Sequence, residues 1–397
     1  MTDSSNPITC PNCLKEGMRV FYEVRNIPVH SVLLMETREK ALNYPRRDLK
    51  LGFCPACGFI ANTAFDPTVH EYSTSCEESQ GFSPTFNAFA RALAKRWVAD
   101  YNLRGKSILE IGCGKGEFLV EMIEQGMGSG IGIDPAYIPG RLGSQAVEKI
   151  EFIQDLYSER YTHLKADVVC CRHTLEHIAP THQFMEMVKK TIGDQKDTTL
   201  LFELPDVHRV LKEAAFWDIY YEHCSYFSCG SLARLFRQTG FTPLELDLEF
   251  DGQYIIIAGK PSSPEDSTPN LPLEDDLEEL AGDVESFPSR FQKIADQWRG
   301  TISSHHNSGR KVILWGGGSK AVSFLTTLGL GDEIRYVVDI NPHKHGKFIP
   351  GAGHAVKGPD ALVADKPDVV ILMNPVYQKE VREMLNGLGV YPEILPV

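Results

Sequence analysis

The sequence predicts an α/β protein with two Rossmann-like units that follow a small cysteine-containing domain. A buried strand that runs into a glycine-rich turn and then a helix occurs twice, at 107–117 and at 311–320. Strands and helices alternate after each turn, which is typical of a doubly wound sheet. Two Cys-x2-Cys pairs precede the first turn.

Length, charge and cysteine content restrict the possible classes of protein. A chain of 397 residues is expected to form two or three domains. Its net charge of -13 disfavours nucleic acid as a partner, because such binding depends on neutralising phosphates. No apolar run is long enough to cross a bilayer, and no secretory leader is recognisable. We therefore expect a cytoplasmic protein with no membrane partner, whose ten cysteines are reduced or bind metal.

The expected elements can be placed in order along the chain. A β-rich stretch at 17–23 is followed by a helix at 83–101, where apolar residues recur at helical spacing. Residues 261–272 are rich in Pro and Ser, as in a linker, and an acidic helix is expected at 273–298. The expected strands lie at 107–111, 130–134, 167–170, 198–203, 254–258, 311–315, 335–339 and 368–373.

The two cysteine pairs predict a structural metal site. Each pair can offer two thiolates on a tight turn, and four sulfur ligands with no position for water are typical of structural zinc. A redox pair would need a thioredoxin-like context, which is absent from the sequence. Four unrelated thiols remain the alternative. The predicted ligands are Cys10, Cys13, Cys54 and Cys57.

The first glycine turn carries an acid–glycine pattern followed by an acid at the tip of the next strand. Such an acid can hold both ribose hydroxyls, and here it is Asp134. The alternative is a turn that only connects a strand to a helix. Together these runs resemble motifs I and II of the class I S-adenosylmethionine (SAM) methyltransferases, which implies SAM as the cofactor. The expected SAM contacts are Glu110, Gly112, Gly114, Gly116, Asp134 and, at the adenine amino group, Asp155.

The run 216–227 combines tyrosines, acids and a histidine, and is the expected substrate side. By itself it could be a set of hydrogen-bonded packing residues. It resembles the Tyr-x-Glu-His motif of the deoxysugar C-methyltransferases, which add a methyl branch to a nucleotide-linked keto sugar. The resemblance spans nearly the whole chain and implies that His223 is the base that makes a carbon nucleophile. The further residues it implies are Tyr220, Glu222, His177 and Tyr72 for catalysis and His173 in the cofactor site.

The second glycine turn resembles the family's nucleotide-diphosphate site. Backbone amides at a helix N-terminus together with a lysine form a plausible anion site. Without the family context, a purely structural turn is equally well supported. The expected substrate-binding residues are Gly316, Gly318, Ser319, Lys320 and Asn374.

The chain departs from the family pattern at positions that face the substrate in the family. Gln253 ends a Phe-Asp-Gly-Gln run in place of a His-Gly-Gly run, Pro375 stands where a histidine is usual, and Tyr221 replaces a polar residue. The substrate is therefore a nucleotide-linked sugar, an atypical sugar or another small molecule. An O- or N-methyltransferase, a protein that only senses SAM and, last, a dehydrogenase are the alternatives.

We thus expect a SAM-dependent C-methyltransferase that acts as a monomer or homodimer. Its central unit is a class I SAM methyltransferase domain with a Rossmann-like fold. The expected segments are a zinc-binding domain at 1–70, the methyltransferase domain at 71–260, a linker and acidic helix at 261–300, and a Rossmann-like substrate-binding domain at 301–397.

Overall fold

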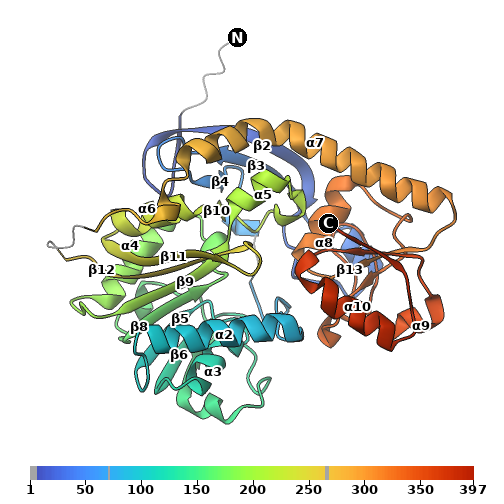
Figure 1. The fold of residues 1–397 in the computed structure, drawn as a ribbon. Helices are drawn as coiled ribbons and strands as arrows, with labels where there is room; N and C mark the ends of the chain where they lie inside the picture. The colour runs from blue at the N-terminus through green and yellow to red at the C-terminus, as the bar shows by residue number, and fades with distance from the viewer. Residues whose placement is uncertain (1–6, 70–71, 264–267) are drawn as a thin grey trace.

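The computed structural model describes residues 7–69, 72–263 and 268–397, and three β-sheets organise them (Figure 1). The expected boundary at residue 70 and part of the expected linker lie outside the described residues. The N-terminal sheet has the order β1-β2-β3-β4-β10 and is antiparallel throughout. Its strands are β1 (Ile8–Thr9), β2 (Glu16–Pro28), β3 (Arg46–Phe53), β4 (Ile60–Asn62) and β10 (Ser225–Tyr226).

The last strand of the N-terminal sheet comes from the middle of the chain. Ser225 pairs with Ala61, and Tyr226 pairs with Ile60. The segment that carries the predicted catalytic histidine is therefore fixed to the N-terminal sheet by backbone hydrogen bonds.

The central sheet has the order β11-β12-β9-β8-β5-β6-β7. Its strands are parallel except that β12 runs antiparallel to both β9 and β11. The parallel strands confirm the first Rossmann-like unit, whereas β11 was not among the expected strands. The strands are β5 (Ser107–Ile111), β6 (Ser129–Ile133), β7 (Ile150–Ile153), β8 (Val168–Arg172), β9 (Thr199–Pro205), β11 (Phe241–Glu249) and β12 (Tyr254–Pro261).

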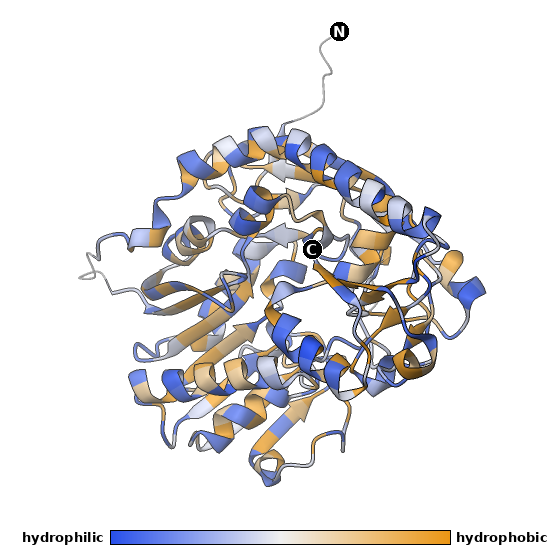
Figure 2. Cartoon of the chain, turned by 45° about the vertical axis from the view of Figure 1, so that its right-hand side comes forward, coloured by the Kyte–Doolittle hydropathy of each residue, from blue (hydrophilic) through white to orange (hydrophobic). Residues whose placement is uncertain are grey.

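Helices cover the central sheet on both faces. Figure 2 shows the apolar residues gathered on the strands and the polar residues on the outer sides of the helices. Ser83 caps α2 by accepting a hydrogen bond from the Phe86 amide, which explains where this helix begins. The helices are α2 (Pro84–Asp100), α3 (Glu117–Glu124), α4 (Thr181–Ile192), α5 (Val207–Glu213) and α6 (Cys229–Gln238); α1 (Arg38–Leu42) lies between β2 and β3.

The C-terminal sheet is fully parallel, with the order β15-β14-β13-β16-β17. It confirms a second Rossmann-like unit. Its strands and helices are β13 (Val312–Trp315), α8 (Ser319–Leu328), β14 (Val337–Val338), β15 (Val356–Lys357), α9 (Ala361–Asp365), β16 (Val369–Leu372), α10 (Gln378–Gly387) and β17 (Glu393–Pro396).

A single long helix, α7 (Leu277–Asn307), joins the two Rossmann-like units. It is the acidic helix expected from the sequence, but it extends beyond residue 298 and accommodates Pro288 in its interior. In Figure 1 it passes over the N-terminal sheet toward the C-terminal sheet, and it packs against β2, α5, α8 and β13. No helix in the described part of the chain is long and apolar enough to span a membrane.

One hydrophobic core is shared by the N-terminal sheet, α7, the C-terminal unit and the segment 216–221. Within it, Phe216 stacks on Phe324 with ring centroids 5.8 Å apart, and Phe324 belongs to α8. Because this core draws on distant parts of the chain, it fixes the N-terminal sheet and the C-terminal unit relative to each other and to segment 216–221.

Candidate active site

A cavity of about 620 Å³ lies between the central and C-terminal sheets, where the glycine turns after β5 and β13 face each other. Open α/β sheets bind ligands at the carboxyl ends of their strands, and both turns lie at such ends. The cavity is lined by most of the residues expected from the sequence, namely Tyr72, Glu110, Gly112, Gly114, Asp134, His173, His177, Tyr220, Glu222, His223, Gly316, Gly318, Ser319, Lys320 and Asn374.

Two expected cofactor residues do not line this cavity. Gly116 shapes the turn instead: it caps α3 with φ +89°, and a Cβ there would come within 2.6 Å of Phe152. The Asp155 carboxylate accepts hydrogen bonds from Arg160 and Tyr161 at 2.7 and 2.6 Å. Sequence reasoning placed Asp155 by its position after β7, but its side chain turns to its own loop.

Gly112 in the first glycine turn has no room for a side chain. Gly112 has φ +73°, and a Cβ there would lie 2.0 Å from Thr174 Oγ1. Gly114 has φ +55°, and its amide donates to Asp134 at 2.9 Å. Asp134 also accepts from the Ala136 amide at 2.6 Å, while burial raises the pKa of its carboxyl. The turn and the acid at the tip of β6 therefore form one hydrogen-bonded unit.

A buried group of charges lies at the ends of β5, β8 and β9. Arg172 Nε is 2.5 Å from Glu203 Oε2, and the Arg172 guanidinium covers the ring of Phe118 at 3.7 Å. Burial alone would lower the pKa of His173, but the Glu203 and Glu176 carboxylates raise it to about 9. The carboxyl of Glu110 is also buried, and burial raises its pKa to about 7.

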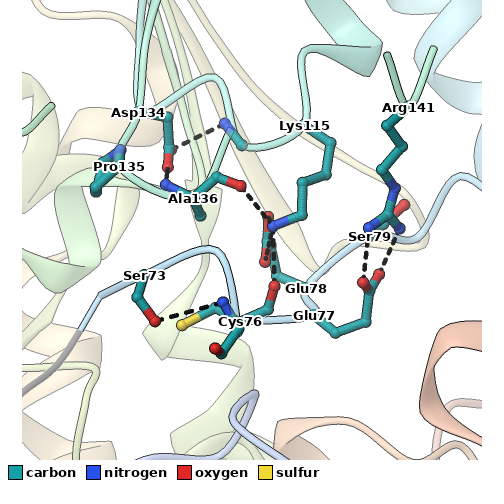
Figure 3. A network of polar contacts seen from close by, with 12 residues as sticks. Ser73, Cys76, Glu77, Glu78, Ser79, Lys115, Asp134, Pro135, Ala136 and Arg141 are labelled. Carbon is teal, nitrogen blue, oxygen red and sulfur yellow. Dashed lines mark hydrogen bonds and ion pairs between the residues drawn. The ribbon is translucent and has the colours of Figure 1, made fainter. Parts of the chain in front are cut away.

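Lys115, inside the glycine turn, holds the segment 72–83 over the cavity (Figure 3). Its buried ammonium donates to the carbonyls of Cys76 and Ala136 at 2.9 and 2.8 Å and lies 3.2 Å from Glu78. The neighbouring Glu77 pairs with Arg141 of the central unit and accepts from Asn341 of the C-terminal unit at 2.8 Å. The segment is thus attached to both Rossmann-like units.

Alternate side chains of the segment 217–222 point in different directions. Trp217, Ile219 and Tyr221 are buried in the shared core, and the Tyr221 hydroxyl accepts from the Asp66 amide at 2.8 Å. The intervening side chains line the cavity; these are Asp218, Tyr220 and Glu222. Tyr221, expected at a substrate-facing position, does not line the cavity and serves instead to anchor the segment.

Two imidazoles and two phenols meet at the centre of the cavity. The rings of His177 and His223 pack edge to face with centroids 4.7 Å apart, and Tyr220 lies 4.1 Å from His223. Tyr72 packs on His177 at 5.8 Å. His177 Nδ1 lies 3.2 Å from the Glu222 carbonyl oxygen, which can only accept, so this nitrogen carries the proton.

The second glycine turn places a cation beside segment 217–222. Lys320 lies 2.5 Å from Asp218, which also accepts from Arg209 at 2.7 Å. Although burial opposes it, the pair of cations lowers the pKa of Asp218. The Gly317 amide donates to Asp339 at 2.7 Å, so the turn repeats the arrangement seen at Gly114 and Asp134.

Gln253, where the sequence departs from the pattern of the resembled family, contacts Asn374, which matches that pattern. The side-chain amides of Gln253 and Asn374 donate to one another at 3.0 Å in both directions and are buried. This reciprocal pair joins the central unit to the C-terminal unit at the wall of the cavity. Sequence analysis treated the two positions separately.

The four expected metal ligands are brought together outside the cavity. Their sulfur atoms lie within 4.8 Å of one another, with Cys10 and Cys57 at 3.7 Å and Cys13 and Cys54 at 3.7 Å. A tetrahedron with metal–sulfur distances of about 2.3 Å has edges of about 3.8 Å. The spacing therefore fits a tetrahedral metal ion and is far longer than a disulfide bond.

Several cavity residues were not found from the sequence. Lys115 stands within the glycine motif, and its burial gave no sequence signal. Asp218 lies in the expected substrate run and Arg209 lies before it, and neither has a motif of its own. His30 and Ser31 do not line the cavity but contact Glu222, and they come from a segment with no recognisable motif.

Comparisons with known proteins agree with this architecture. Residues 85–246 match the family model described as a methyltransferase domain, and residues 275–389 match the one described as a C-methyltransferase C-terminal domain. The chain is 27% identical over 309 residues to the C-methyltransferase NovU of Streptomyces niveus. The aligned region covers 74% of this chain and 72% of that protein.

Two similar solved structures each cover less than half of this chain. One is the 1,6-didemethyltoxoflavin-N1-methyltransferase of Burkholderia thailandensis, with 16% identity, a TM-score of 0.35 and coverage of 44% of this chain and 79% of that one. Another is the magnesium protoporphyrin IX methyltransferase ChlM of Synechocystis, with 18% identity, a TM-score of 0.35 and coverage of 45% and 84%. Both contain bound S-adenosylhomocysteine.

The buried Glu110 predicts a pH-dependent stability. Its pKa of about 7 in the folded chain lies above its ordinary value of 4.5. Its contribution to folding is therefore complete below about pH 4.5 and is lost as the pH rises through about 7. Glu110→Gln removes this titration.

Relative to Glu110→Gln, the wild type should lose up to about 3 kcal/mol in free energy of unfolding between about pH 5 and pH 8. Chemical denaturation of both proteins across this range is the measurement, and the paired comparison cancels other titrating groups. Parallel pH curves for the two proteins would contradict the raised pKa.

Proposed function

We propose that this chain, a SAM-dependent methyltransferase with a C-methyltransferase C-terminal domain, methylates a carbon next to a carbonyl group on a nucleotide-linked keto sugar. The observation that carries the proposal is the meeting of His223, His177 and Tyr220 in one cavity bounded by both glycine turns. The homologue and the C-terminal domain support carbon as the methylated atom.

The residues around the first glycine turn fit SAM. Asp134 is placed to accept from ribose hydroxyls, and Gly112 and Gly114 allow a ligand to approach the backbone. The Glu110 Oε2 atom is buried and has no hydrogen-bond partner among the described residues, so it can receive the cationic amino group of the methionine portion. His173 lines the same end of the cavity. When bound, SAM supplies a methyl group on a sulfonium that departs as a neutral thioether.

His223 is the proposed base. It removes the proton from the carbon next to the substrate carbonyl, because imidazole exchanges protons near neutral pH. The electron pair of the broken C–H bond passes to the carbonyl oxygen and forms an enolate. The enolate carbon then takes the methyl group, a carbon–carbon bond forms, and the imidazolium of His223 later releases its proton to solvent.

Tyr220 is the proposed donor to the enolate oxygen. Burial, together with the nearby Asp218 and Glu222 carboxylates, raises its pKa well above the usual range of a phenol. A phenol that stays protonated can donate a hydrogen bond as negative charge develops on oxygen. His177, whose proton is on Nδ1 and directed to Glu222, can donate from Nε2 only as an imidazolium.

The second glycine turn supports an anionic portion of the substrate. The residues of this turn that line the cavity are Gly316, Gly318, Ser319 and Lys320. The helix α8 begins at Ser319, and the free backbone amides at a helix N-terminus favour an anion. Arg209 adds a second cation near Lys320. This composition suits a diphosphate better than a neutral small molecule. An O- or N-methyl transfer to another small molecule remains the alternative, and it requires no proton removal from carbon.

The cysteine cluster is the proposed structural zinc site. Arg234 donates to the Cys57 carbonyl at 2.9 Å, and the Asn12 amide lies 3.9 Å from its sulfur, so residues beyond the ligands also stabilise the two turns. With four sulfur donors the site leaves no position for substrate. Zinc would stabilise the N-terminal sheet to which β10 is paired.

Zinc should be present at one ion per chain. Cys54→Ser should lose the metal and several kcal/mol of folding free energy, because the ligands are assembled only in the folded state. Elemental analysis and thermal unfolding are the measurements. Cys171→Ser, a buried thiol outside the cluster, should keep the zinc. A metal-free wild type that is folded and active would contradict the site.

Binding of S-adenosylhomocysteine should depend on the first turn. Gly114→Ala and Asp134→Ala should each weaken it about tenfold or more, the loss of one or two good polar contacts. Asp155→Ala is the matched control, since its carboxylate pairs with Arg160 outside the cavity. Calorimetry gives the affinities. Unchanged binding in both turn variants would exclude this site.

His223→Ala should reduce turnover at least about a hundredfold, the scale of a proton-transfer residue, with SAM affinity nearly unchanged. Without SAM, the wild type should exchange the substrate α-proton for deuterium, and the variant should not. His182→Ala, a histidine that contacts Asn12 away from the cavity, is the control. Normal turnover and exchange in His223→Ala would place the base elsewhere, with Tyr220 the next candidate.

A further inference from the structure

We propose that His30 and Ser31 are positioning residues that orient both catalytic imidazoles through Glu222. The inference rests on the proposed roles of His223 and His177. It assigns to Glu222 a structural part in catalysis in place of proton transfer. Both residues lie just beyond β2, so they belong to the segment that leaves the N-terminal sheet.

The Glu222 carboxylate is turned toward His30 and Ser31. The Ser31 amide donates to Glu222 Oε2 at 2.7 Å, and the Ser31 hydroxyl donates to Oε1. His30 Nδ1 lies 3.0 Å from Oε2. All three residues are at least 98% buried. A carboxylate removed from water to this extent needs charged or strongly polar partners, and these two residues supply them.

The main chain of Glu222 then places the two imidazoles. Its carbonyl oxygen accepts from His177 Nδ1 at 3.2 Å, and His223 is the next residue in the chain. The side-chain contacts with Ser31 and His30 oppose a shift of the Glu222 main chain, and such a shift would move both rings. Since a displacement of about 1 Å in a catalytic group can cost about a hundredfold in rate, the anchoring has a direct effect on catalysis.

Ser31 also contacts the substrate side of the cavity. Its hydroxyl oxygen lies 2.6 Å from the hydroxyl of Ser319, the first residue of α8. Because the Ser31 hydroxyl donates its one hydrogen to Glu222, the Ser319 hydroxyl is the donor in its hydrogen bond with Ser31. Ser31 thus connects Glu222 of segment 217–222 with the proposed anion-binding turn.

The inference is tested by comparing Ser31→Ala with Ser31→Thr. Ser31→Ala should lower kcat by about tenfold or more, slow deuterium exchange of the substrate α-proton in proportion, and leave the KM for SAM nearly unchanged. Ser31→Thr keeps the hydroxyl and should recover most of both rates. Ser107→Ala removes a hydroxyl–carboxylate bond of the same kind, to Asp167 at 2.8 Å, outside the cavity, and should retain wild-type rates.

Two substitutions of Glu222 distinguish a positioning role from a role in proton transfer. Glu222→Gln keeps an oxygen acceptor for the Ser31 amide and turns its NH2 group to the Ser31 hydroxyl oxygen, which can accept. It should therefore retain more activity than Glu222→Ala, with the pH profile of kcat unchanged in shape. A Gln variant as inactive as the Ala variant would show that Glu222 carries a proton and would overturn the inference.

Zinc content and thermal midpoint distinguish positioning from unfolding. If Ser31→Ala loses zinc or unfolds at assay temperature, His30→Gln replaces it, with the same expected loss in kcat and exchange. Wild-type kcat and exchange in these variants would overturn the inference and leave the proposed function intact. Absence of exchange in the wild type would instead count against the carbanion mechanism.

Discussion

The segment 217–222, which precedes the proposed base, depends on apolar side chains that alternate with its polar ones. Trp217, Ile219 and Tyr221 are held in a core to which the N-terminal sheet, α7 and α8 all contribute. The side chains of Asp218, Tyr220 and Glu222 alternate with these anchored residues and line the cavity. The position of the proposed base therefore follows from the packing of the N-terminal sheet, α7 and the C-terminal unit against one short segment.

Charges at the site are buried in matched sets that cross between structural units. Lys320 of the C-terminal unit pairs with Asp218, and Glu77 joins Arg141 to Asn341. Removing one partner of such a pair costs more than the pair contributes to stability, because the other charge stays desolvated. These contacts fix the distance between the two glycine turns, across which a methyl donor and an anionic substrate would have to meet.

Much of the fold and most of the candidate site could be predicted from local sequence patterns. Glycine turns, strand runs and cysteine pairs each depend on residues close together in the chain, and Gly112, Asp134 and Cys54 were identified in this way. The side-chain contacts of Asp155 and Tyr221 could not be predicted in this way, because the direction of a side chain depends on tertiary packing. The contacts of Ser31 with Glu222, and of Gln253 with Asn374, join residues more than a hundred positions apart, so no local pattern indicates them.

The central claim is that the methyl group is transferred to carbon. The most direct test is to incubate the enzyme with SAM carrying a 13C-labelled methyl group and a nucleotide-linked keto sugar labelled with 13C in the sugar ring, and to record the NMR spectrum of the product. The proposed function predicts one-bond coupling between the labelled methyl carbon and a ring carbon next to the carbonyl. A labelled methyl group bonded to oxygen or nitrogen, without that coupling, would contradict it.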